Sequence, residues 1–148
     1  MSISWGDIFL DINEFDVQRV LEQWSPLVSG PLQPMGMSAF GDVYFLRPNG
    51  TVHVLDVLEG QVRQVANTQD EFAACMNAKE WQEANLLPGV VWQLHSRGLK
   101  RAPGQVFGFA PHPALAGKID PELAMPLDAV AWHSICTQTV GPQAAGTP

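Results

Sequence analysis

Residues 38–66 read SAFGDVYFLRPNGTVHVLDVLEGQVRQVA, and this stretch decides the fold class. It is rich in β-branched and aromatic residues, which favour strands. Two turn signals interrupt it: Asn49-Gly50, the strongest short hairpin signal, and Glu59-Gly60. A type I′ turn at the first of these would need positive φ at both residues. The stretch predicts strands at residues 38–47, 51–58 and 61–66, joined as an antiparallel meander.

Before the meander, two amphipathic stripes are followed by a proline-rich segment. Apolar residues recur at the helical spacing i, i+3, i+4, i+7 in both stripes. The two sets are Trp5, Ile8, Phe9 and Ile12, then Val17, Val20, Leu21 and Trp24. We expect helices at residues 5–12 and 14–24, with Asn13 as the N-cap of the second. Residues 25–37 hold three prolines and two glycines, which predicts an ordered loop.

After the meander, the pattern becomes helical again. Thr68 and Glu71 have the spacing of a capping box, and Phe72 and Met76 lie on the apolar side of the helix that follows. The remaining elements predicted are helices at residues 79–84 and 88–97, a strand at 105–109, a loop at 110–126 and a final strand at 127–140.

These elements predict an α+β fold. It has N-terminal helices, a largely antiparallel sheet of about five strands, and a helical segment between strands three and four. Residues 1–140 are expected to form a single domain, and residues 141–148 a flexible tail.

The composition narrows the function classes. The chain has 148 residues, 15 acids against 8 bases, a formal net charge of −7 and a pI near 4.8. Nucleic-acid binding needs clustered Lys and Arg, so direct contact with nucleic acid is not expected. Pro and Gly punctuate the long uncharged runs, which a membrane-spanning helix of about 20 apolar residues would avoid. With no signal-peptide pattern and no disulfide framework beyond Cys75 and Cys136, we expect a cytoplasmic protein.

The usual catalytic signatures are missing from the sequence. It has no Walker loop, G-x-G-x-x-G or H-E-x-x-H motif, and Phe40 replaces the final Gly of a nucleophile elbow at residues 36–40. No two of the four histidines have the i, i+4 spacing of metal ligands. On the expected strand at residues 127–140, His133 and Cys136 would face opposite sides. We therefore predict no enzyme activity, no cofactor and no metal site.

Acidic residues are the candidates for a binding surface. They dominate the polar faces of the expected N-terminal helices, which indicates either a plain solvated surface or a negative patch that steers a basic partner. Two further acids lie in the loop at residues 110–126, too few for a calcium site. The candidate partner-binding residues are Asp7, Asp11, Glu14, Asp16, Glu22, Asp120 and Glu122.

The five tryptophans divide into two groups. Trp24, Trp92 and Trp132 fall on apolar stripes and are expected in the core. Trp5 and Trp81 are flanked by acids and are expected to be partly exposed. An exposed Trp beside carboxylates can be structural or can serve as an interface anchor.

Three short segments occur in an order that resembles a known family. They are Ser38-Ala39-Phe40-Gly41-Asp42, Pro103-Gly104-Gln105-Val106-Phe107-Gly108-Phe109 and Pro113-Ala114-Leu115-Ala116-Gly117. Together they resemble the bacterial type VI secretion immunity proteins defined by the C-terminal domain of an immunity protein to a DNase effector. The beginning of the chain is similar to the GAD-related segment that often precedes this domain. The likeness covers residues 15–138.

The resemblance implies a role without a chemistry of its own. It implies an immunity protein that binds a cognate type VI secretion toxin, a DNase, and neutralises it in a stoichiometric complex that blocks or distorts the active site. Acidic charge suits such a partner because nuclease domains have basic substrate grooves. The free protein is expected to be a monomer or a weak dimer. The alternative is a SUKH-like regulatory module with a non-toxin protein partner.

Overall fold

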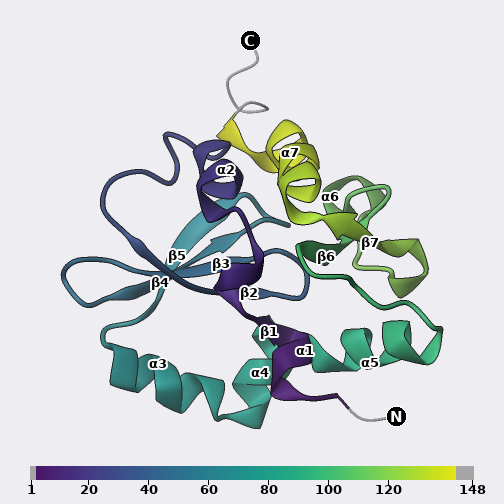
Figure 1. Ribbon diagram of the computed structural model, residues 1–148, viewed down its shortest axis with the longest axis horizontal. Coiled ribbons are helices and arrows are strands. Elements are labelled where there is room, and N and C mark those ends of the chain that lie inside the picture. The colour runs from purple at the N-terminus through teal and green to yellow at the C-terminus, as the bar shows by residue number, and fades with distance from the viewer. Residues whose placement is uncertain (1–2, 143–148) are drawn as a thin grey trace.

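The computed structural model describes residues 3–142 and has an α+β fold. A five-stranded antiparallel sheet has the order β1-β2-β3-β4-β5, and β6 and β7 form a separate two-stranded sheet (Figure 1). The strands are β1 (Phe9–Leu10), β2 (Gln33–Ser38), β3 (Val43–Leu46), β4 (Val52–Asp56), β5 (Gln61–Ala66), β6 (Gln105–Phe109) and β7 (Ala124–Asp128). Most of the flexible tail expected at residues 141–148 lies outside the described residues, from residue 143 onward.

Helices both precede and follow the large sheet. They are α1 (Trp5–Ile8), α2 (Val17–Glu22), α3 (Gln69–Met76), α4 (Lys79–Asn85), α5 (Pro88–Ser96), α6 (Pro113–Ala116) and α7 (Ala129–Val140), with 3-10 turns η1 (Ile12–Glu14) and η2 (Pro121–Leu123). The expected position of the helical segment, between strands three and four, is wrong: α3 to α5 follow β5. The strand numbers differ because the sequence patterns did not predict β1 and β2. No helix within residues 3–142 is long and apolar enough to cross a membrane.

The central hairpin forms where the sequence predicted it, but with a different turn. β3 and β4 pair from Val43↔Leu55 to Leu46↔Val52. Within the connecting loop, residues 48–50, Gly50 alone has positive φ, at +89°. A type I′ turn is therefore wrong, and the connection is a three-residue loop that ends in a left-handed glycine. β4 and β5 pair as predicted.

Two strands replace predicted helix and loop near the N-terminus. The expected helix at residues 5–12 ends early, because Phe9 and Leu10 pair with Ser38 and Met37 of β2 and so join the edge of the sheet. β2 begins in the segment expected as a loop, so the single strand expected at residues 38–47 is a hairpin with a tight turn. The second helix is shorter than expected, and Asp16, not Asn13, caps it.

The last element is a helix, so the strand expected at residues 127–140 is wrong. Asp128 is its N-cap, because its carboxylate accepts a hydrogen bond from the Ala131 N–H. The buried residues of α7 follow helical spacing; they are Ala129, Trp132, His133, Cys136 and Thr137. β7 forms within the segment expected as a loop and pairs with β6.

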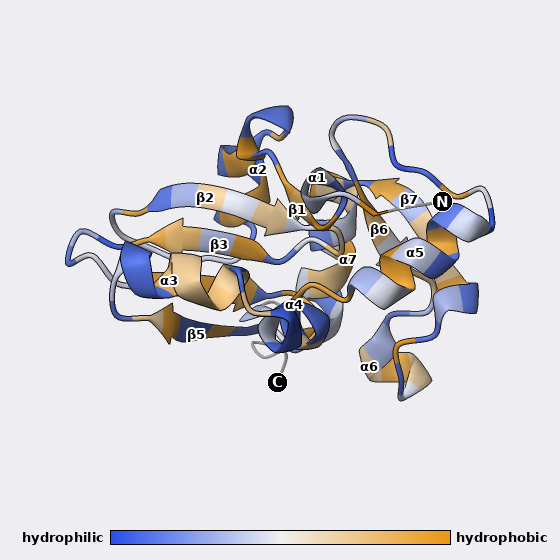
Figure 2. Cartoon of the chain, turned by 90° about the horizontal axis from the view of Figure 1, so that it is seen from below, coloured by the Kyte–Doolittle hydropathy of each residue, from blue (hydrophilic) through white to orange (hydrophobic). Residues whose placement is uncertain are grey.

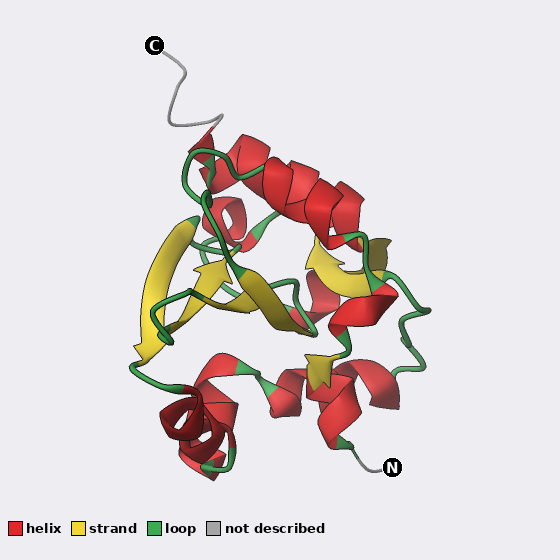
Figure 3. Cartoon of the chain, turned by 60° about the vertical axis from the view of Figure 1, so that its left-hand side comes forward, coloured by secondary structure: helices red, strands yellow, loops and turns green. Residues whose placement is uncertain are grey.

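The large sheet lies between two groups of helices. Figures 1 and 3 show α1, α3, α4 and α5 on one side, and α2 and α7 on the other. Figure 2 shows a largely apolar β3 and a largely hydrophilic α4. Trp24 and Trp132 are fully buried, as expected, whereas Trp92 is 47% exposed, so its expected place in the core is wrong. It lies on the outer face of a helix whose inner face is provided by Val91 and Leu94.

Candidate functional site

Four of the seven predicted partner-binding acids have a local structural task. Asp11, Asp16 and Asp120 cap η1, α2 and η2, each accepting a hydrogen bond from a backbone N–H in the first turn. Asp7 accepts hydrogen bonds from both the backbone N–H and the hydroxyl of Ser4. These contacts stabilise helix starts and leave the acids at or near the surface. Their binding role stays a prediction.

The other three predicted acids differ in their partners. Glu14 forms an ion pair with Arg101 at 2.9 Å, and Glu122 lies 3.6 Å from Arg97. Glu22 is exposed. The structure brings Asp7 and Glu14 together in one pocket of about 290 Å³, where Arg101 also lies. Asp120 and Glu122 lie at the start of η2, where the Pro121 carbonyl accepts a hydrogen bond from Arg97 at the C-terminal end of α5, and neither lines the pocket of Asp7 and Glu14.

Most of the negative charge has no cation beside it. Five ion pairs form within residues 3–142, and each uses a different acid and a different base. All 15 acids lie in this part of the chain, and ten of them have no cationic partner within 4.0 Å among these residues. Apart from Asp42, which burial shields, these acids leave a surplus of negative charge that is available to a positively charged partner.

The helices α3 and α4 carry a dense part of this charge. Residues 69–85 contain a single cation, Lys79, which is paired weakly with Glu83 at 3.9 Å. The four acids on these helices are exposed; they are Asp70, Glu71, Glu80 and Glu83. They were not among the predicted acids, although their local excess over Lys79 is visible in the sequence.

Trp5 lies against the same two helices. Its ring stacks on Phe9 with centroids 5.4 Å apart, yet 43% of the residue is exposed. It lines a shallow pocket of about 370 Å³ together with Met76 of α3 and Gln82 of α4. The partial exposure expected for Trp5 is thus confirmed. We call Trp5 together with the exposed acids of α3 and α4 the Trp5 face.

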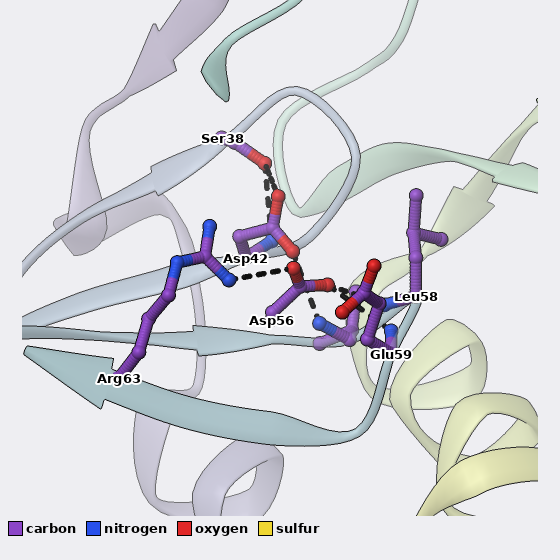
Figure 4. Close-up of polar contacts among 7 residues, drawn as sticks. Ser38, Asp42, Asp56, Leu58, Glu59 and Arg63 are labelled. Atoms are coloured by element: carbon purple, nitrogen blue, oxygen red, sulfur yellow. Dashed lines mark hydrogen bonds and ion pairs between the residues drawn. The ribbon is translucent and has the colours of Figure 1, made fainter. Parts of the chain in front are cut away.

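A second acidic feature lies on the large sheet, where two carboxylates meet. Val43 pairs with Leu55, so the next position along the hairpin sets Asp42 opposite Asp56. Figure 4 shows the two carboxylates directed towards one another. Asp56 accepts hydrogen bonds from the Leu58 and Glu59 N–H groups, and it forms an ion pair with Arg63 at 2.8 Å.

Asp42 braces the turn between β2 and β3. One carboxylate oxygen accepts from the Val57 N–H at 3.0 Å, and the other accepts from the Ser38 hydroxyl at 2.9 Å. Burial, followed by the charge of Asp56, raises the pKa of Asp42 to about 7. Asp42 can therefore take up or release a proton near neutral pH. Residues 38–42, the first of the three segments that carry the family resemblance, form this brace.

The paired carboxylates line an open pocket of about 480 Å³. Tyr44 also lines this pocket and is 1% exposed; its ring packs against both Phe72 and Trp81, at centroid distances of 5.5 and 6.0 Å. Within residues 3–142 its hydroxyl has no hydrogen-bond partner, while buried polar atoms closed off from solvent all have one. The hydroxyl therefore opens into the pocket.

The pocket wall also contains backbone in an unusual conformation. Leu87, between α4 and α5, has φ +52° and ψ +53° and lines the pocket beside Asn85. A left-handed conformation costs a residue with a large side chain on the order of 1–2 kcal/mol. Such strain is found most often at functional sites. Within the described residues, Leu87 is the one residue other than glycine with positive φ.

His133 and Cys136 serve the core. Because α7 is a helix, the two side chains share its buried face, so the expectation of opposite faces is wrong. His133 accepts a hydrogen bond from the Trp24 indole N–H at Nδ1 and donates from Nε2 to the Gly41 carbonyl, both at 2.8 Å. Burial lowers the pKa of His133 to about 4 and raises the pKa of the Cys136 thiol. Neither group is poised for proton transfer at neutral pH.

Comparisons with known proteins identify the fold. No protein-family model matches the chain, and no curated protein matches it. Among solved structures, the crystal structure of Atu4351 from Agrobacterium tumefaciens is similar, with a TM-score of 0.59 and 17% sequence identity. The match covers 88% of this chain and 66% of that chain, so this chain spans just under two thirds of its length. At this identity the likeness shows a shared fold alone.

Proposed function

We propose that this protein is an immunity protein that binds a cognate type VI secretion toxin with a basic nuclease domain and neutralises it in a one-to-one complex. The observation that carries the proposal is the charge: ten of 15 acids have no cationic partner within 4.0 Å among residues 3–142. Charge of one sign raises the association rate with a partner of the opposite sign. The resemblance of residues 38–42, 103–109 and 113–117 to the immunity family supports the same role.

The Trp5 face is the surface that we assign to the toxin. An aromatic side chain that is part exposed above a pocket can anchor an interface, because large rings bury much area at little entropic cost. The exposed acids of α3 and α4, Asp70, Glu80 and Glu83 among them, complement a basic substrate groove. Occupation of that groove by this face would exclude DNA from the toxin in the cytoplasm of the producing cell.

Two matched charge reversals test the proposal. The toxin domain encoded next to this chain is co-expressed with it, and growth rescue and complex formation are measured. The first triple variant is Asp70→Lys, Glu80→Lys and Glu83→Lys; the second is Asp11→Lys, Glu22→Lys and Glu122→Lys, which makes the same change of net charge among acids predicted from the sequence.

The proposal expects the first triple to lose protection and the second to keep it. Loss with the second triple alone would move the interface to the sequence-predicted acids. If neither the parent nor its variants bound the toxin, the immunity role would be refuted, and stable capture of a regulatory protein would favour the SUKH-like alternative.

A further inference from the structure

The pocket between the sheet and the α4–α5 junction has the features of a binding site for a cationic hydrogen-bond donor. Its floor holds Asp42 and Asp56, which belong to neighbouring strands and are brought together by the register of the β3–β4 hairpin. Each carboxylate can accept about four hydrogen bonds. Asp42 uses two of these sites and Asp56 three, so both retain acceptor capacity towards the pocket.

Tyr44 provides an independent sign that the pocket accepts a ligand. The residue is 99% buried by its packing, yet its hydroxyl opens into the pocket without a hydrogen-bond partner among the described residues. Phe at this position would pack against Phe72 and Trp81 equally well, so the structure offers no packing reason for the hydroxyl. The hydroxyl reaches the pocket and can donate to or accept from a group bound there.

The acceptors around the pocket match a guanidinium group. They come from three different elements: Asp42 and Tyr44 flank the start of β3, Asp56 ends β4, and Asn85 ends α4. The Asn85 amide nitrogen already donates to the Trp81 carbonyl, which directs the amide oxygen elsewhere as a free acceptor. A guanidinium has five N–H donors in a planar fork and can reach several such acceptors at once, whereas an ammonium has three donors.

A metal ion fits the pocket less well than an organic cation. Within residues 3–142 no group of three or more His, Cys, Asp and Glu side chains is arranged to hold a metal. Arg63 already lies 2.8 Å from Asp56, and its charge would repel a divalent cation bound to the same carboxylate. A guanidinium has a single charge that is delocalised over the group, so the repulsion from Arg63 is weaker.

We infer that this pocket binds the guanidinium group of an arginine side chain that the protein partner inserts between Asp42, Asp56 and Tyr44. The assignment of the arginine to a partner protein rests on the proposed function, because a basic nuclease domain presents such side chains. The pocket is continuous with α4, whose exposed acids belong to the Trp5 face, so one partner can occupy both. An arginine buried at the centre of an interface is a frequent binding hot spot.

Binding of the cation depends on the protonation of Asp42. A bound guanidinium favours the ionised carboxylate, so affinity rises with pH through the Asp42 pKa of about 7. If the ionised form alone binds, affinity at pH 8 exceeds that at pH 6 by about tenfold. The other titratable or charged groups near Asp42 are Tyr44 on β3, Asp56 on β4, Glu59 in the following turn, Arg63 on β5, His112 before α6, and His133 and Cys136 on α7.

His133 is neutral across that pH range, because burial lowers its pKa to about 4, and burial lowers the pKa of His112 as well. We therefore assign the pH dependence to Asp42. Asp42→Asn keeps an acceptor for the Val57 N–H and does not titrate, so it is expected to flatten the change between pH 6 and pH 8.

The first experiment uses the free protein and titrates it with N-ethylguanidinium while amide shifts are followed by NMR. N-ethylurea is the neutral control of the same shape. We expect saturable shifts at the pocket residues with the guanidinium and at least about tenfold weaker binding of the urea. Tyr44→Phe should weaken guanidinium binding about tenfold without a change in melting temperature, whereas Gln18→Ala, at an exposed position of α2, should change neither. No saturable binding of the guanidinium would overturn the inference.

The second experiment measures the dissociation rate of the toxin complex for the same variants. Faster dissociation with Tyr44→Phe, and not with Gln18→Ala, is the expected result. A complex unaffected by Tyr44→Phe, in a protein that still binds N-ethylguanidinium, would overturn the assignment to a partner's arginine and leave free arginine as the ligand. Because the NMR titration needs no toxin, failure of the immunity role and failure of the pocket are distinguishable.

Discussion

His133 should lower the stability of the fold in acid, by an amount that follows from its burial and its hydrogen bonds. The ring is fully buried, and its neutral form is required by both hydrogen bonds: Nδ1 accepts from Trp24, and Nε2 donates to Gly41. Protonation of Nδ1 would place a second N–H donor opposite the Trp24 indole N–H, with no acceptor between them. Burial accordingly lowers the pKa of His133 to about 4, from an ordinary value near 6.5.

The linkage gives the sign and size of the effect. In the unfolded chain His133 gains a proton below about pH 6.5, while the folded chain resists it until about pH 4. The stabilising contribution is therefore fully present above pH 6.5 and is lost as the pH falls towards 4. The difference between the two pKa values corresponds to about 3 kcal/mol of unfolding free energy.

A comparison of the parent with His133→Gln isolates this contribution. The Gln amide can accept from Trp24 and donate to Gly41 but does not titrate. Urea unfolding between pH 4 and pH 8, followed by tryptophan fluorescence, should show the stability gap between the two proteins narrow or reverse by about 3 kcal/mol at pH 4. If the difference in unfolding free energy between the two proteins did not change with pH, the reasoning would be refuted, because the fold would then not require a neutral His133.

Three further predictions follow from local geometry and charge. Gly60→Ala should cost at least about 3 kcal/mol, because its Cβ would lie 2.2 Å from the Val140 carbonyl oxygen; Gly117→Ala, also at positive φ but with open space around it, should cost about 1 kcal/mol, as measured by urea unfolding. Gly50→Val should cost about 1–2 kcal/mol by strain alone, and a variant as stable as the parent would refute the three-residue hairpin loop. Trp5→Ala should weaken the toxin complex about thirtyfold. Association of the parent with the toxin should slow as salt is added, and an association rate that does not depend on salt would argue against electrostatic steering.

The strands with strong local signals were predictable from the sequence, and the strands without them were not. β4 and β5 alternate between turn signals, and their positions were confirmed. β1 has two residues inside a helical stripe, and its pairing with β2 depends on a sheet edge that no local pattern reveals. For α7 the signal was present and was misread: Asp128 is a good N-cap, and Trp132, His133 and Cys136 have helical spacing.

The carboxylate pair depended on a single detail of the hairpin. A two-residue turn at Asn49-Gly50 would pair Asp42 with Val57, which places Asp42 and Asp56 on opposite faces. The three-residue loop shifts the register by one and sets the two carboxylates opposite each other. Gly50 alone supplies the positive φ for that loop. The carboxylate pair could therefore be predicted from the sequence only if the turn type were already known.

The central claim, stoichiometric neutralisation, is tested most directly by titrating the toxin's nuclease activity with this protein. The account predicts that activity falls linearly and reaches zero near one equivalent, with a one-to-one complex by mass. Single replacement of His53, His95, His112 or His133 by Gln should leave the end point unchanged in variants that fold and bind. Full neutralisation at a small fraction of one equivalent, abolished by a single His or Cys change that leaves binding intact, would contradict the account and mark the protein as an enzyme.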